Sequence, residues 1–258
     1  NISPNDGSVL RISTDGRIPK TVDDWCNLSV SSRSPPSKTI SGSTNGPGSA
    51  TSRFHPHRFL TLRRTAMLRN NSISVRLARD ANDLMLVTAI RSAVYLAEQD
   101  CPIDEEFDGN DLVAAHFIGF VGNEPAGCLR VRFFGDFAKV ERLAVRHQYR
   151  KSTMAFRLVK ASVDYIKRKG FRKIYGQAQD RLVDFWAHFG AKPLPVRRKI
   201  VFSDFSYTEM LLEIEPTPDA ITLESDPYVI IRPEGDWDSP GILDRSADRD
   251  ATSPIRHL

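Results

Sequence analysis

The chain has 258 residues, of which 40% are hydrophobic, so it can hold one large domain or two small ones around a buried core. The formal net charge is only +4, and no apolar run reaches the roughly eighteen residues of a membrane-crossing helix, which argues against a membrane span. Its cysteines, Cys26, Cys101 and Cys128, show no paired metal-ligand spacing and are too few for a disulfide-stapled secreted protein, so we predict no metal site and a cytoplasmic protein.

Residues 1–71 form a basic segment rich in Ser, Thr, Pro, Gly and Arg, with no glutamate before Glu98. Such a composition buries too little apolar surface to offset the entropy of ordering, so we predict a disordered extension. Its arginine-rich, acid-poor character resembles an organelle transit peptide, clearest at residues 58–64, whereas the position of Met67 favours an upstream extension without function. Aromatic residues are not interleaved with the basic ones, so we predict no nucleic-acid partner.

From residue 72 to about 215 the sequence changes to alternating strand and helix patterns. The first strand covers residues 73–77, and Asp80 is placed to cap a helix whose apolar face extends to Val94. An acidic loop follows at 100–111. Three strands that we expect to be antiparallel come next, at 116–121, 126–134 and 139–145, with a hairpin turn at 122–123.

A long amphipathic helix begins at Ala155 and ends at Gly170, which suits a helix C-terminal cap. Later elements are predicted as a strand at 173–178, a short helix at 182–189 and a strand pair at 199–202 and 207–214. Residues 216–258 are acidic and rich in Pro, Asp and Ser. We predict a short strand at 228–232 there and otherwise a loose C-terminal tail.

The turn between the strand that ends at Val145 and the long helix is polar and basic, with Arg150 and Lys151 in it. A strand that leads through such a turn into a helix offers free backbone N–H groups and the positive end of the helix dipole, which together bind phosphate. The pattern therefore predicts a cofactor with a pyrophosphate. The alternative is a solvated helix start.

This α+β order of elements resembles that of the GNAT acyltransferases, the general-control-related N-acetyltransferase superfamily. Residues 150–155 (Arg-Lys-Ser-Thr-Met-Ala) stand where that family has its Arg/Gln-x-x-Gly-x-Gly/Ala loop. Further similarities, within residues 73–214, lie at 98–99, Pro102, 106–108, Asp111, His116, 127–130, 178–179 and 185–190. The resemblance implies a mixed, mostly antiparallel central sheet flanked by helices.

The resemblance also implies acyl-coenzyme A as co-substrate, with acetyl-coenzyme A expected first. The backbones of Leu143 and Val145 would then pair with the pantetheine arm. The amides of the loop would hold the pyrophosphate, which adds Thr153, Met154 and Ala155 to Arg150 and Lys151 as cofactor-binding residues. Thr153 departs from the family, because it stands where the first loop glycine is usual and adds a β-branched side chain, so weak coenzyme A binding stays open.

Direct acyl transfer to an amine requires a base, because an ammonium ion is not a nucleophile. Glu141 is the candidate, since it lies on the strand beside the proposed thioester and could act through a water. The alternative is a salt bridge with Arg130 or Arg142. The family often protonates the leaving thiolate with a tyrosine, and Trp186 stands there instead; its indole N–H is a donor only.

A second resemblance is to acyl-homoserine-lactone and long-chain N-acyl amino acid synthases, which share a GNAT-like fold. The charged residues that match their order are Arg91, Asp108, Asp111, Arg130 and Arg142. The resemblance implies that this cluster orders the acidic loop over the active site and that the donor is carried on acyl-carrier protein. Lys139 departs from the glutamate that these synthases usually carry, and the alternative for the cluster is a structural ion-pair network.

The prediction is therefore an N-acyltransferase that moves an acyl group, acetyl first, from acyl-coenzyme A to the primary amine of a small molecule. A long-chain synthase and a non-catalytic acyl-coenzyme A-binding module are the alternatives. A homodimer is compatible with the sequence, although no motif indicates one. The sequence does not identify the acceptor amine.

Overall fold

The structure is a computed structural model that describes residues 72–195 and 200–250. The extension predicted for residues 1–71 lies outside the described residues, as do Lys199, at the start of a predicted strand, and the end of the predicted tail. Among the described residues, none of the helices combines the length and the apolar character that crossing a bilayer requires.

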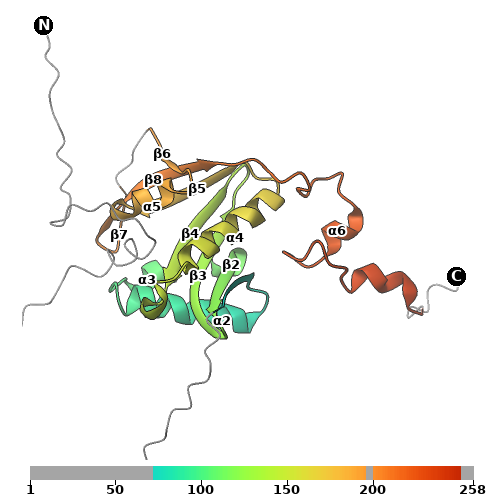
Figure 1. Ribbon diagram of the computed structural model, residues 1–258, viewed down its shortest axis with the longest axis horizontal. Helices are drawn as coiled ribbons and strands as arrows, with labels where there is room; N and C mark the ends of the chain where they lie inside the picture. Colours follow the sequence, from blue (N-terminus) through green and yellow to red (C-terminus); the bar gives the residue numbers. More distant parts are fainter. Residues whose placement is uncertain (1–71, 196–199, 251–258) are drawn as a thin grey trace, which may run out of the picture.

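An eight-stranded sheet forms the centre of the described chain (Figure 1). Its spatial order is β1-β2-β3-β4-β5-β8-β6, and β7 pairs with β8 outside this path. Neighbouring strands are antiparallel except for β4 and β5, which are parallel. The strands are β1 (Ile73–Leu77), β2 (Ala115–Val121), β3 (Glu124–Phe133), β4 (Ala138–Val145), β5 (Lys173–Gln179), β6 (Lys192–Pro193), β7 (Ile200–Phe202) and β8 (Phe205–Glu213).

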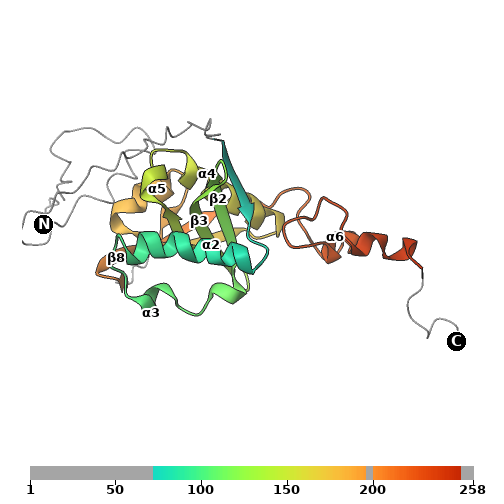
Figure 2. The ribbon, with the colours of Figure 1, turned by 90° about the horizontal axis from the view of Figure 1, so that it is seen from below.

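Helices cover both faces of the sheet (Figures 1 and 2). On one face lies α2 (Ala81–Arg91), which Asp80 caps by accepting the Asp83 N–H at 2.8 Å, and which continues as a π-helical turn, η1 (Ser92–Leu96). On the other face lies α4 (Met154–Arg168), after which Gly170 takes a φ of 81°. The shorter helices are α3 (Ile103–Glu106), η2 (Asp111–Val113), η3 (His147–Tyr149), η4 (Asp180–Leu182), α5 (Val183–Ala187), α6 (Pro227–Ile231) and η5 (Leu243–Asp248).

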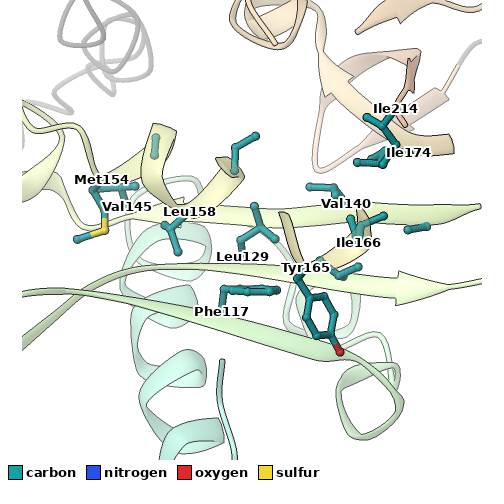
Figure 3. Packing of buried hydrophobic residues seen from close by; sticks show 14 of the residues in the cluster. Phe117, Leu129, Val140, Val145, Met154, Leu158, Tyr165, Ile166, Ile174 and Ile214 are labelled. Carbon is teal, nitrogen blue, oxygen red and sulfur yellow. The ribbon is translucent and has the colours of Figure 1, made fainter. Parts of the chain in front are cut away.

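The alternation of side chains along the strands divides most of the core into two clusters, and a smaller third cluster consists of Ala178, Ala191 and Met210. Phe117 and Leu129 face α4 and pack with Leu158 and Ile166, as Figure 3 shows. Their chain neighbours point to the other face and pack under α2, in a cluster made of Val87, Ile90, Val94, Ile118, Cys128 and Ala144. The sheet is therefore buried on both sides at its middle strands.

The pairing of β4 with β5 is short, and it matters for the site. It joins Ala138 to Ile174, Lys139 to Tyr175 and Val140 to Gly176, and it stops there. Beyond these residues the two strands no longer pair, although each continues for several residues. A gap thus opens in the sheet between residues 141–145 of β4 and 177–179 of β5.

A bulge changes the course of β4 at this place. The register moves from Arg130↔Glu141 to Cys128↔Ala144, so β4 has one residue more than β3 across the bulge. Arg142 takes a φ of 54°, which is uncommon for a residue with a side chain. A bulge of this kind bends a strand and re-aims its side chains, and it often lies beside a functional site.

The start of α4 packs closely on the sheet because two strand positions have no side chain. Met154 is fully buried, and its side chain occupies the space that a Cβ at Gly119 or Gly127 would need. At Gly127 an added Cβ would also come within 2.9 Å of the Ala144 carbonyl oxygen. These two glycines therefore set the distance between the sheet and the N-terminus of α4.

The strands and helices predicted between residues 73 and 214 are confirmed apart from small differences at their ends. The strand predicted at 228–232 is wrong, because that segment forms α6, whose N-terminus Asp226 caps by accepting the Tyr228 N–H at 2.8 Å. The segment predicted as a loose tail also contributes to the core. Trp237 is buried and stacks on Tyr165, with their ring centroids 5.4 Å apart.

Candidate active site

A cavity of about 500 Å³ occupies the gap between β4 and β5. Its walls come from the unpaired ends of the two strands, from η1, from the acidic loop, from the β7–β8 hairpin and from α5. The apolar part of the wall includes Val94, Leu143, Val145, Phe185, Trp186 and Phe202. Such a concave, largely apolar space with a few polar groups is the usual form of a small-molecule site.

The N-terminus of α4 borders this cavity and leaves backbone donors free. The N–H groups in the first turn of a helix have no partner within the helix. Here the Met154 N–H donates to Ser152 Oγ at 3.3 Å, and Ser152 Oγ donates to the Tyr149 carbonyl at 2.6 Å. The N–H groups of the other residues from Lys151 to Phe156 have no acceptor among the described residues. This arrangement is suited to an anion.

The structure divides the predicted cofactor-binding residues into two groups. Leu143, Val145, Arg150 and Ala155 line the cavity. Lys151 and Thr153 are exposed beside it, and the side chain of Met154 lies in the core, so it can offer only its backbone. The Leu143 carbonyl already accepts the Tyr95 hydroxyl at 2.8 Å. A ligand pairing with β4 at this residue would therefore have to use the N–H side.

The side chain of Arg150 is directed into the protein. Its Nε donates to the Val145 carbonyl at 2.9 Å, and its Nη2 forms an ion pair with Glu98. Arg150 is also buried. These contacts fix the turn between β4 and α4, so the side chain does not present the free charge that the sequence suggested.

Thr153 fits its position without backbone strain. It is the N-cap of α4 with a φ of −78° and a ψ of 14°, values open to any residue. Its Oγ1 accepts Arg157 Nε at 3.3 Å. The threonine in place of the family's first glycine is thus compatible with the conformation of the turn.

Glu141 lines the cavity, and both of its carboxylate oxygens already contact cations. Oε1 accepts Arg130 Nε at 2.9 Å, and Oε2 lies 2.7 Å from Lys139 Nζ. The salt bridge named as the alternative role for Glu141 is therefore present with Arg130. Oε1 also lies 2.9 Å from Arg130 Nη2 and 3.8 Å from Arg132 Nη1, so the acceptor position that stays open for a water is on Oε2.

The five charged residues of the predicted cluster lie together in one ion-pair network. Arg130 is completely buried and binds Asp108 at 2.6 Å and Asp111 at 2.8 Å. Arg91 reaches Asp111 at 2.5 Å, and Arg142 lies 3.3 Å from Asp108. The network ties α2, β3 and β4 to the acidic loop, which it holds against the sheet beside the cavity.

Glu106, which the sequence brought in only through the resemblance at residues 106–108, is a further member of this network. It is almost fully buried between Arg91 and Arg142. Burial raises the pKa of this carboxyl even though both arginines favour its charged form. Neither the resemblance at 106–108 nor the run of acidic residues at 104–108 tells which carboxylate turns inward.

At Asp108, in contrast to Glu106, the hydrogen bonds to the carboxyl outweigh the effect of burial on its pKa. Burial would raise the pKa of its carboxyl, but hydrogen bonds from the Arg130 guanidinium and from the Asn110 N–H hold that pKa well below its usual range. Asp108 therefore remains ionised under all ordinary conditions, and the loop stays attached to Arg130.

Two aromatic side chains with polar groups line the cavity near the end of β5. Trp186 of α5 is half-buried there, at the position where the resemblance led us to expect a tyrosine. Tyr207 of β8 accepts Gln179 Nε2 at 3.2 Å, and burial raises the pKa of its hydroxyl. Tyr207 thus stays protonated and can donate one hydrogen bond into the cavity. Among the described residues, no cluster of His, Cys, Asp and Glu is arranged to hold a metal ion.

Comparisons with known proteins agree with this geometry. A model of the acetyltransferase (GNAT) family matches residues 85–191. BSU40680 of Bacillus subtilis (strain 168), whose name carries a provisional acetyltransferase assignment, is 34% identical over 112 residues, which are 42% of this chain and 76% of that protein. YyaT of the same organism is 32% identical over 102 residues, which are 38% of this chain and 69% of that protein.

The fold has a counterpart among solved structures. A provisionally named N-acetyltransferase from Lactobacillus plantarum superposes with a TM-score of 0.50 at 17% identity, covering 55% of this chain and 99% of that protein. At this level of identity the similarity supports the fold alone.

Proposed function

Since the chain belongs to the GNAT acetyltransferase family and is therefore a transferase, we propose that it moves an acyl group, acetyl first, from acyl-coenzyme A to the primary amine of a small molecule. The observation that carries this proposal is the cavity that opens where β4 and β5 stop pairing, next to free N–H groups at the start of α4. The thioester would lie along β4, and the diphosphate would lie at the helix N-terminus.

Contact with the diphosphate would come mainly from the backbone. Arg150 is engaged with Glu98, so we assign it the role of bracing the turn, in which the N–H groups of Ser152 and Thr153 have no acceptor among the described residues. Lys151 is exposed at the same turn and supplies a charge without a fixed partner among the described residues. Ala155, whose small side chain lines the cavity, leaves room for a close approach to the helix start.

The chemistry requires that a neutral amine attack the thioester carbonyl. The new C–N bond forms, the C–S bond breaks, and coenzyme A leaves as a thiolate that takes up a proton. Glu141 would receive the proton from the amine through a water, on the lone pair of Oε2 that Lys139 leaves free. The hydroxyl of Tyr207 is the protonated group of the cavity wall that could serve the thiolate in place of the family's usual tyrosine.

A second candidate is a synthase that uses longer acyl chains, delivered on coenzyme A or acyl-carrier protein. The observation that favours it is the network of Arg91, Arg130 and Arg142 with the acidic loop, which matches the charge order of such synthases. A cytoplasmic location stays part of either proposal, because Cys101 and Cys128 are free thiols and fit a reducing compartment.

The test is calorimetric titration of the full chain with acetyl-, octanoyl- and palmitoyl-coenzyme A, followed by a thiol-release assay with a panel of primary amines. We expect the acetyl form to bind and to release thiol only when an amine is present. A clear preference for the long chains would favour the synthase. Absence of binding by all three donors would overturn the proposal.

A further inference from the structure

Arg181 stands out because its charge is not compensated within the described part of the chain. It lies in η4, directly after β5, and its side chain lines the cavity. Nη2 donates to the carbonyl oxygen of the Gln179 side chain, and the guanidinium lies 5.7 Å from the centre of the Phe205 ring. Its Nη1 is buried and has no hydrogen-bond partner.

The other cations that line the cavity all have carboxylate partners. Arg142 contacts Glu106 and Asp108, Lys139 contacts Glu141, and Arg150 contacts Glu98. For Arg181 no ion pair with a described carboxylate is present, since its neighbour Asp180 accepts the hydroxyl of Thr208 at 2.7 Å instead. Among the described residues, Arg181 is therefore the cation of the cavity wall that has no carboxylate within ion-pair distance.

Arg181 is half-buried, so its charge has a cost when no carboxylate compensates it, and its buried Nη1 without an acceptor adds to that cost. Burial lowers the pKa of the Arg181 guanidinium; Tyr207 acts in the opposite direction, and the charge of Arg150 adds to the lowering. A ligand with an anionic group would remove both penalties, because guanidinium binds carboxylate through charge-assisted hydrogen bonds in a fixed geometry.

The surroundings of Arg181 indicate which ligand this is. Its neighbours Phe205 and Tyr207 belong to β8, and Tyr207 packs against Phe202 of the β7–β8 hairpin with ring centroids 5.2 Å apart. The tip of this hairpin bonds to the acidic loop, where Ser203 Oγ lies 2.7 Å from Glu105. Arg181 thus belongs to the wall formed by β8 and the acidic loop, whereas the proposed diphosphate site is formed by the start of α4.

We propose that Arg181 binds an anionic group of the acceptor, so that the acceptor is an amine that also carries a carboxylate, such as an amino acid. This inference rests on the proposed acyl transfer and specifies its substrate class. The apolar wall formed by Phe202 and Trp186 further favours an acceptor with an apolar side chain.

The test uses matched acceptors that differ only in the carboxylate: L-phenylalanine with phenethylamine, and L-leucine with isoamylamine. The variants are Arg181→Met, which keeps apolar length without the charge, and Arg181→Lys, which keeps the charge. Arg172→Met is the control, because Arg172 is an exposed residue that pairs with Glu215 away from the cavity. Thiol release is measured at saturating acetyl-coenzyme A, and the affinity for acetyl-coenzyme A is measured separately.

We expect the wild-type chain to prefer the amino acid of each pair. Arg181→Met should lower kcat/KM for the amino acids by about tenfold or more, as the loss of a charge-assisted hydrogen bond implies, and should leave the simple amines unaffected. Arg181→Lys should recover part of the loss. An equal loss for both members of each pair, or a loss confined to the affinity for acetyl-coenzyme A, would overturn the inference, and the latter would assign Arg181 to a phosphate of the donor.

A binding measurement separates this inference from the proposed reaction. N-acetyl-L-phenylalanine and N-acetylphenethylamine are titrated into the full chain, and the wild type is compared with Arg181→Met. If the carboxylate form binds more tightly and that preference depends on Arg181 while no turnover is found, the inference holds and the proposed reaction fails. If turnover occurs without any preference for carboxylates, the reaction holds and the inference fails.

Discussion

At Glu141 two roles compete for the same carboxylate. The contacts with Arg130 and Lys139 would be expected of a residue that only holds charges together, while its place in the cavity wall is that of a general base. Sequence could place Glu141 on β4, beside the position proposed for the thioester, because alternation along the strand is simple to follow. It could not tell that both oxygens contact cations, since those contacts depend on how β3 and β4 pair.

Glu141→Gln separates the two roles. The amide cannot accept a proton, so we expect kcat to fall about a hundredfold, in the range of general-base catalysis, while the affinity for acetyl-coenzyme A changes little. Steady-state kinetics and calorimetric titration check this. Glu124→Gln is the control, at an exposed carboxylate at the start of β3. An unchanged rate in Glu141→Gln would leave Glu141 with the structural role alone.

His116 makes stability depend on pH. Its Nε2 lies 2.9 Å from the Asp111 carbonyl, to which it must donate, and its Nδ1 is buried without a partner. Burial therefore lowers the pKa of His116, against the opposing effect of the Asp111 carboxylate. The pKa of His116 is thus lower in the folded state than in the unfolded state. Its contribution to the free energy of unfolding is therefore complete above about pH 6.5 and is lost as the pH falls below that value.

When the pH is lowered from 7 to 5, we expect the urea concentration at the unfolding midpoint of the wild type to decrease. The decrease should be smaller in His116→Gln. The exposed His147 provides the control, and His147→Gln should follow the wild type. Chemical denaturation at a series of pH values measures this. A slope in His116→Gln equal to that of the wild type would show that other groups cause the pH dependence.

Among the elements, the contact between α4 and the sheet fixes the position of the free N–H groups. It depends on Met154 filling the space above Gly119 and Gly127. The sequence indicated the strand, the turn and the helix, because each has a local signal. The close contact had none, since it joins residues that lie far apart in the chain.

Gly127→Ala should disturb this contact. The added Cβ would lie 2.9 Å from the Ala144 carbonyl oxygen and 3.1 Å from Met154 Cγ. We expect a loss of about 1–3 kcal/mol in the free energy of unfolding, as for other overpacked cores, together with weaker binding of acetyl-coenzyme A. Gly135→Ala is the control, because nothing lies within 4 Å of a Cβ there. Urea unfolding measures the loss. Equal stability of the two variants would show that the contact between α4 and the sheet does not depend on the missing side chain at Gly127.

The strand predicted at 228–232 shows where local patterns compete. Tyr228, Val229, Ile230 and Ile231 are residues that favour strands. Asp226 and Pro227 precede them, however, and these are a helix cap and a residue suited to the first helical turn. With no neighbouring strand to pair with, the helix start signals prevail.

At the scale of the whole molecule, the C-terminal segment is anchored to the enzyme core by one aromatic residue and several charges. Trp237 stacks on Tyr165, and Lys169 lies 5.8 Å from its ring. Arg79 pairs with Asp236 at 2.6 Å. Composition alone led us to expect a loose tail here, because acidic, proline-rich segments usually bury little. A single buried tryptophan in such a segment is a signal that the average composition hides.

Trp237→Ala should release this segment. We expect a loss of about 3 kcal/mol in the free energy of unfolding, as for other large aromatic truncations, and faster proteolysis after residue 216. Tyr228→Ala removes an exposed ring from the same segment and should change neither property. Urea unfolding and limited proteolysis provide the measurements. A proteolysis pattern identical to that of the wild type would show that Trp237 does not hold the segment.

The cavity is the feature of the whole molecule that sequence could least define. Its walls come from β4, β5, η1, the acidic loop, the β7–β8 hairpin and α5, and their meeting depends on the strand order. The resemblance to the family indicated where a donor would lie. The unpaired charge of Arg181 became visible only when its neighbours were known.

Hydrogen exchange of the full chain with and without saturating acetyl-coenzyme A tests the central claim most directly, namely that the donor lies between β4 and the start of α4. We expect slower exchange at residues 143–145 and 150–156, with little change in β1 and β2. Protection confined to other parts of the chain, or no protection at saturation, would contradict it.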